Sequence, residues 1–177
     1  MKILLRIAAV ILFVFVALIT YVIIFGNKSF DAPLPDIQAS NDSTLIARGK
    51  YLSNNVANCY GCHTDRDLQS GSFIGEPFAG GFYMPPEPFS EGYSFVTPNL
   101  TPDPETGIIA DWDEDLFLDR FKSGRVYKGT PMPWGAYSRM PVGDVKALYR
   151  YLQTLKPVHN KLEKLVFAPG EDLPARP

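Results

Sequence analysis

The hydrophobic pattern of the chain begins with an unbroken apolar run near the N-terminus. Residues 7–25 contain no charged side chain, and Lys2 and Arg6 precede them. A helix of about 20 apolar residues crosses the hydrocarbon core of a membrane, and flanking cationic residues favour the cytoplasmic side. We therefore predict that residues 1–26 form one transmembrane helix with a cytoplasmic N-terminus.

A cleaved signal peptide is the alternative, because it also combines basic residues with an apolar segment. The apolar run is longer than the roughly 7–15 residues usual in such a peptide. Residues 26–30 contain no Ala-x-Ala-like cleavage site. We expect an uncleaved single-pass anchor, and in both interpretations the rest of the chain is exported.

The segment after the apolar run has a different character. Residues 27–41 contain two prolines and few large apolar residues, which is typical of a flexible tether. Fully extended, they would reach at most ~50 Å, so the tether would keep the next domain near the membrane. We expect that domain over residues 42–158, followed by a C-terminal tail over residues 159–177.

The first amphipathic pattern of the domain covers residues 43–52, shortly before the two cysteines of the chain. Residues 41–43, Asn-Asp-Ser, are good helix-capping residues. The apolar side chains that approximate one helical face are Leu45, Tyr51, Leu52 and Val56. We predict a first helix that leads into the cysteine pair.

Two further helices are predicted in the second half of the domain. Acidic residues begin the segment 113–121 and suit the positive end of a helix, and Gly124 is expected to end it. The third helix should begin near Pro141, follow an apolar stripe at three- and four-residue spacing and stop at Lys156-Pro157. No alternating strand pattern is long enough to predict a sheet, so we expect an all-α domain.

Composition and charge further limit the possible fold and partners of the domain. The 16 prolines and 14 glycines of the chain indicate a domain rich in loops. Outside the N-terminal apolar segment there are 15 basic and 19 acidic side chains, a formal charge of −4. This balance argues against nucleic acid as a partner.

Cys59, Cys62 and His63 form the motif Cys-x-x-Cys-His, which is typical of c-type haem attachment. The two thiols add to the haem vinyl groups, and the histidine binds the iron. A redox dithiol or half of a zinc site is the alternative. The chain has only two cysteines and two histidines, and His159, which we expect to be exposed, is far away in sequence. We predict one covalently bound haem c, attached outside the cytoplasm of a bacterium.

A second axial ligand of the iron is expected among the methionines. Met132 lies between two prolines, which keep its segment out of a helix, and local chemistry favours it. Met84 lies in a similar segment and remains a competitor. Met140 is expected to pack as an apolar residue at the start of the last helix.

Four side chains are candidates to hydrogen-bond the haem propionates or to line the haem pocket. They are Asn99, Trp112, Trp134 and Tyr137. Each could equally be an ordinary core or turn residue, and the sequence does not decide between these roles.

Several stretches of the domain follow one another in a recognisable order. They are Arg48–Leu52, Cys59–Thr64, Phe78–Gly81, Thr97–Asp103, Thr106–Ile108, Trp112–Phe117, Pro131–Trp134 and Asp144–Leu152. Together they resemble a class I cytochrome c domain, and more narrowly the haem modules in cytochrome subunits of membrane-bound alcohol, aldehyde and gluconate dehydrogenases. The resemblance implies three main helices around a covalent haem, with the first and last helices crossing near Gly49. It also implies that Met132 is the distal ligand.

His63 and Met132 together would leave no open position on the iron, which predicts an electron carrier rather than an enzyme. The expected partners are the membrane and redox proteins such as a quinol-oxidising complex, a dehydrogenase or a terminal oxidase. The expected location is the bacterial cytoplasmic membrane, with the haem domain on the periplasmic side, as a tethered shuttle or a subunit of a complex. The alternative is a haem enzyme or ligand sensor whose sixth ligand is labile.

Overall fold

The computed structural model of the chain describes residues 2–25, 43–87, 90–123 and 129–174. They belong to two units, residues 1–33 and residues 34–177. The expected tether lies outside the described residues, as does Gly124, the expected end of the second helix. The domain boundaries stay predictions.

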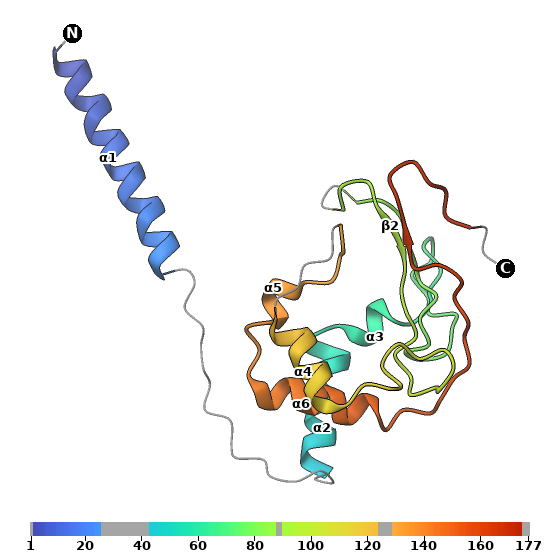
Figure 1. Ribbon diagram of the computed structural model, residues 1–177. Helices are drawn as coiled ribbons and strands as arrows, with labels where there is room; N and C mark the ends of the chain where they lie inside the picture. The colour runs from blue at the N-terminus through green and yellow to red at the C-terminus, as the bar shows by residue number, and fades with distance from the viewer. Residues whose placement is uncertain (1, 26–42, 88–89, 124–128, 175–177) are drawn as a thin grey trace. The chain divides into compact units, whose positions relative to one another are not determined.

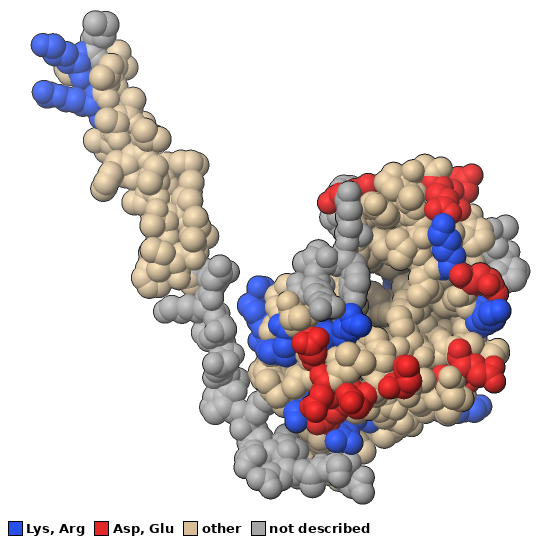
Figure 2. Space-filling model, viewed as in Figure 1, with Lys and Arg blue, Asp and Glu red and all other residues tan. Residues whose placement is uncertain are grey.

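The first unit contains the apolar helix α1 (Lys2–Phe25; Figure 1). Among the described residues, α1 is the one helix long and apolar enough to cross a membrane. Its 24 residues extend about 36 Å at 1.5 Å per residue, which exceeds the ~30 Å hydrocarbon core. Basic side chains gather at one end of α1, and the rest of its surface is uncharged (Figure 2). Anchors and signal sequences share these properties.

The second unit is rich in helix, and a helix occupies each of the three predicted segments. Its helices are α2 (Ser43–Tyr51), a π-helix (Leu52–Val56), α3 (Cys59–Cys62), α4 (Glu114–Lys122), α5 (Trp134–Tyr137) and α6 (Val142–Leu152). Asp113 caps α4, because its carboxylate accepts a hydrogen bond from the Leu116 amide at 2.7 Å.

A small antiparallel sheet corrects the expectation of an all-α domain. Its strands are β1 (Tyr83–Met84), β2 (Ser94–Val96) and β3 (Val166–Phe167), and β2 lies between the other two. Strands of two or three residues are too short to give an alternating pattern in the sequence. Because Phe95 pairs with Val166, the sheet fastens the expected C-terminal tail to the domain (Figure 1).

The predicted face of the first helix is correct at Leu45 and Leu52 and wrong at Tyr51, which precedes the π-helix, and at Val56, which the π-helix displaces. Tyr51 and Val56 are 55% and 57% exposed, whereas Leu45, Gly49 and Leu52 are buried. A π-turn holds more residues than an α-turn, so it changes the face that each later residue occupies. The α-helical period used for the prediction therefore fails at Val56.

Helices α2 and α6 are in very close contact at Gly49. A Cβ atom on Gly49 would lie 2.0 Å from the Ala147 carbonyl oxygen and 2.7 Å from the Tyr151 Cβ. Beside this contact Arg48 binds Asp144 through two hydrogen bonds, from Nε at 2.8 Å and from Nη2 at 3.0 Å. The crossing therefore lies at the residue that the resemblance implied.

The core of the domain lies on the inner side of α6. Val145, Ala147 and Leu148 are fully buried there. They pack in one cluster with buried aromatic side chains, which include Phe78 and Phe117. Since α6 also contacts α2 and α4, it connects the helix that precedes the cysteines with the helix at 114–122.

We expect Gly49→Ala to destabilise the domain by about 1–3 kcal/mol, because the added methyl group must separate α2 from α6. The control is Gly135→Ala in α5, where the added Cβ would have nothing within 4 Å. Urea unfolding of the detergent-solubilised protein measures both free energies. Equal values for the two variants would contradict the close contact.

Candidate functional site

A cavity of about 590 Å³ lies in the second unit, where the space-filling view shows a hollow (Figure 2). Its volume falls within the range of about 300–1,000 Å³ that is typical of cofactor sites. Its wall is mostly apolar, and Cys59, Cys62, His63 and Met132 all line it. The structure thus brings the four predicted binding residues to one cavity.

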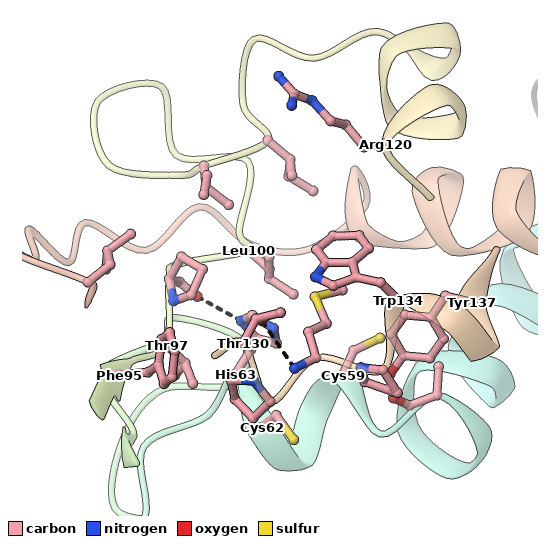
Figure 3. Close-up of a pocket in the computed structure, with 18 of the residues that line it drawn as sticks. Cys59, Cys62, His63, Phe95, Thr97, Leu100, Arg120, Thr130, Trp134 and Tyr137 are labelled. Atoms are coloured by element: carbon pink, nitrogen blue, oxygen red, sulfur yellow. Dashed lines mark hydrogen bonds between the residues drawn. The ribbon is translucent and has the colours of Figure 1, made fainter. Parts of the chain in front are cut away.

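The cysteines lie on the single turn of α3. Asn58, in the left-handed region with φ of 53°, precedes this turn. The Cys62 amide donates to the Asn58 carbonyl at 3.1 Å, and the His63 amide donates to the Cys59 carbonyl at 2.8 Å. Both cysteines therefore line the cavity from one short segment (Figure 3).

Burial affects the ionisation of both thiols. It raises the pKa of Cys59 to about 12, and it also raises the pKa of Cys62. Because an apolar environment disfavours the thiolate, both groups stay protonated at neutral pH. This protonation disfavours a reactive dithiol, whose function needs an accessible thiolate.

His63 is held in a defined orientation. Its Nδ1 lies 2.9 Å from the Pro98 carbonyl oxygen, and the residue is only 9% exposed. Burial lowers the pKa of the His63 imidazole. The hydrogen bond to the Pro98 carbonyl raises this pKa, but its effect is smaller. The ring is therefore neutral, with Nδ1–H donating to Pro98 and Nε2 left as the metal-binding nitrogen. Histidine ligands in metalloproteins are commonly oriented by such a bond.

Gly80 makes the contact between His63 and Pro98 possible. Its amide donates to the His63 carbonyl at 2.8 Å. A Cβ atom on Gly80 would lie 2.4 Å from the Thr97 carbonyl oxygen and 2.5 Å from the Pro98 carbonyl carbon. Its φ of +74° also favours glycine. Gly80 lies in one of the stretches that carry the resemblance, but its role could not be predicted because its partners Thr97 and Pro98 are distant in sequence.

Two of the three candidate methionines line the cavity. Met132 reaches it from the segment before α5 and Met84 from β1, whereas Met140 packs against the hydrophobic core.

Tyr137 of α5 donates from its hydroxyl to the Ala57 carbonyl at 2.5 Å. This bond connects the Met132 side of the cavity with the segment that enters the cysteine turn.

Of the two roles left open for Asn99, the structure supports the structural one, because Asn99 is not among the residues that line the cavity. It is 1% exposed. Its amide nitrogen donates to Thr106 at 3.0 Å and to the Val158 carbonyl at 2.8 Å. Its amide oxygen accepts from the amide and the hydroxyl of Thr101. Since both donors and both acceptor positions are used, Asn99 joins its loop to the segment after α6.

The other three candidates, Trp112, Trp134 and Tyr137, line the cavity. Arg120 also lines it from α4 (Figure 3), and the sequence analysis missed this residue. Nothing in the local sequence distinguishes Arg120 from the other basic residues of the domain. His159 is largely exposed, and its Nδ1 lies 3.6 Å from a carboxylate oxygen of Asp103.

These residues fit a covalent haem better than a bare metal ion. Within the described part of the chain, no group of three or more His, Cys, Asp or Glu side chains is placed to hold a metal ion. The two thiols on one turn, the oriented imidazole and the thioethers instead surround an apolar cavity. Thioether and imidazole are established axial ligands of haem iron.

Curated proteins similar to this chain include three cytochrome subunits of dehydrogenases. The gluconate 2-dehydrogenase cytochrome c subunit of Pantoea cypripedii is 37% identical over 133 residues, which cover 73% of this chain and 26% of that protein. The alcohol dehydrogenase (quinone) cytochrome c subunit of Gluconobacter oxydans is 33% identical over 123 residues, 66% of this chain and 23% of that protein. The fructose dehydrogenase cytochrome subunit of Gluconobacter japonicus is 33% identical over 147 residues, 80% of this chain and 28% of that protein.

The resemblance predicted from the motifs is confirmed by these homologues. The chain spans about a quarter of the length of the curated relatives that it matches. No protein-family model matches it.

We expect Gly80→Ala to displace Pro98 and weaken its bond to His63. Gly71→Ala is the matched control, because Gly71 has a similar φ of +71° but nothing within 4 Å of an added Cβ. Both variants carry the backbone strain of about 1 kcal/mol, and only Gly80→Ala adds the steric clash. Urea unfolding should show a larger loss for Gly80→Ala by at least about 1 kcal/mol, and equal losses would disprove the clash.

Proposed function

We propose that this chain, a homologue of the cytochrome c subunits of gluconate, alcohol and fructose dehydrogenases, is a membrane-anchored monohaem cytochrome c that transfers single electrons. One observation carries the proposal. The turn with Cys59 and Cys62 and the oriented ring of His63 share one apolar cavity with the thioether of Met132. The cavity thus has cysteines suited to attach a haem, a histidine suited to bind its iron from one side and a methionine suited to bind it from the other.

Cys59 and Cys62 are the residues that attach the haem. Each thiol would add across one vinyl group, so that a carbon–sulfur bond would form and the thiol proton would go to the other vinyl carbon. The addition needs no oxidant or reductant. Because the two sulfurs lie on one turn of α3, they would hold one edge of the ring and fix its place in the cavity.

His63 and Met132 are the proposed axial ligands. The Pro98 carbonyl holds the Nδ1–H of His63, so that Nε2 would be presented to the iron with a fixed orientation. When bound, haem supplies a one-electron iron couple, and a methionine ligand raises its reduction potential. The apolar wall excludes water from the ligands. With both axial positions filled by the protein, the site transfers electrons instead of binding oxygen.

The length and composition of α1 support a membrane anchor, with the haem domain on the periplasmic side of a bacterial cytoplasmic membrane. The names of the relatives support a dehydrogenase as the electron donor. A quinol-oxidising complex would be an alternative electron donor, and a terminal oxidase would be the electron acceptor. In this role the chain acts as a tethered shuttle or as a subunit of a complex.

The distal ligand is tested with Met132→Leu and Met84→Leu, since leucine approximately conserves the side-chain volume. The ferric native protein should show the weak red absorption band of methionine sulfur bound to haem iron. We expect Met132→Leu to lose this band and Met84→Leu to keep it, because Met132 is the proposed ligand.

Loss of the band only in Met84→Leu would assign the ligand to Met84. A native protein with covalent haem but no red band would favour the enzyme or sensor with a labile sixth ligand. A native protein without haem would contradict the proposed function.

The anchor is tested by cell fractionation and by the mass of the mature protein. Because α1 should remain in the membrane, we expect the full-length chain to resist extraction by alkaline carbonate. A variant with a cleavable leader in place of residues 1–26 should be soluble in the periplasm. A native mature protein that starts beyond residue 26 and is soluble would identify the segment as a signal peptide.

A further inference from the structure

The carbonyl group that orients His63 belongs to Pro98, a residue without a backbone N–H. Pro98 therefore has no donor of its own with which to fasten its position. Its carbonyl lies in the same peptide plane as the amide nitrogen and the Cα atom of Asn99. The direction of this carbonyl thus depends on how firmly Asn99 is held.

Asn99 is held through both its backbone and its side chain. Its carbonyl accepts from the Ile108 amide at 2.8 Å. Its side-chain oxygen accepts from the Thr101 hydroxyl at 2.8 Å, and its side-chain nitrogen donates to the Val158 carbonyl at 2.8 Å. Because Val158 follows α6 in the chain, these bonds fasten the peptide of Pro98 to the segment after the core helix.

The Thr106 hydroxyl connects Asn99 with a second part of the same segment. It accepts from the side-chain nitrogen of Asn99 at 3.0 Å and from the Asn160 amide at 3.1 Å. It donates to the Asp103 carboxylate at 2.7 Å. One donor and two acceptor positions are all that a hydroxyl has, so the bonding capacity of Thr106 is fully used.

Asn160 extends this network to the backbone of His63. Its side-chain nitrogen donates to the Ala79 carbonyl at 2.9 Å. The next residue, Gly80, donates from its amide to the His63 carbonyl at 2.8 Å. The ring and the backbone of His63 are therefore held by two routes, and both routes lead to Thr106.

We propose that Asn99 is a positioning residue for the iron ligand His63, and that Thr106 joins it to the segment after α6. Asn99 does not line the cavity, so it acts on the site only through the Pro98 carbonyl. This inference rests on the proposed function, because it takes His63 as an axial ligand of haem iron.

The position of Asn99 should affect the electron affinity of the iron. A hydrogen bond from Nδ1–H makes Nε2 of a histidine a stronger ligand. A stronger electron donor stabilises the ferric form more, because ferric iron carries one more positive charge than ferrous iron. Loss of the Asn99 bonds should loosen the Pro98 carbonyl, weaken its bond to His63 and raise the reduction potential, while both axial ligands stay in place.

The test uses the full-length haem-loaded protein in detergent, with the variants Asn99→Ala and Thr106→Val. Thr106→Val keeps the shape of the side chain and removes only the hydroxyl. Ser90→Ala is the matched control, because Ser90 is 2% exposed and its hydroxyl bonds at 2.9 Å to Glu87 and Tyr93, outside this network. All three variants lose buried hydrogen bonds, and only the first two loosen Pro98.

Redox titration followed by absorption gives the first measurement. In Asn99→Ala we expect the ferrous-to-ferric ratio at fixed ambient potential to rise by about two- to tenfold, which corresponds to the net effect of one hydrogen bond. Thr106→Val should raise the ratio by a smaller factor, since it leaves Asn99 bonded to Thr101 and Val158. Ser90→Ala should leave the ratio unchanged.

NMR of the ferrous protein with ¹⁵N-labelled histidine gives the second measurement. The Nδ1–H of His63 should exchange with deuterium on the order of tenfold faster in Asn99→Ala than in Ser90→Ala, because its bond opens locally. The amide of Leu148, a fully buried residue of α6, serves as the reference for global opening. If Asn99→Ala does not accumulate with haem, Thr106→Val decides alone, with the same direction of change in both measurements.

A His63 exchange rate that rises only in proportion to that of Leu148 would overturn the positioning role. A reduction potential that changes no more than in Ser90→Ala would also overturn it. Either result in a native protein with covalent haem and the red band would leave the proposed function intact. Absence of haem from the native protein would refute the proposed function and this inference together.

Discussion

The close contact between α2 and α6 is the constraint on which the cavity depends. The two backbones meet at Gly49, where a side chain would overlap the Ala147 carbonyl. Helix α2 continues through the π-helix toward α3, so this contact also determines where the cysteine turn lies. Helix α6 contributes Leu148 and Leu152 to the wall of the same cavity. This one steric contact therefore fixes the position of the cysteine turn and the position of part of the cavity wall.

The chemistry of the site could be predicted because its key residues are adjacent in sequence. Cys59, Cys62 and His63 lie within five residues, and their spacing alone indicates how they act together. The three main helices could be located for a similar reason, since caps and apolar periodicity are local signals. Prolines around Met132 indicated a non-helical segment, and the structure places that segment at the cavity.

The features that could not be predicted depend on partners distant in sequence. The strands are too short for a pattern, and their pairing joins segments as far apart as Phe95 and Val166. Asn99 has the same side chain whether it faces a cofactor or joins two segments, and only its bonds to Thr101, Thr106 and Val158 decide. Arg120 is likewise distinguished only by the cavity that it faces.

The pairing of β3 with β2 has a consequence for the order of assembly. Leu165 and Val166, near the end of the chain, line the cavity, and β3 fixes them there. In the proposed export from the N-terminal end, Cys59 would emerge from the membrane well before these residues. The cavity wall would then still be incomplete when the cysteines first become accessible. Under this proposal the haem would enter first and the last strand would close over it.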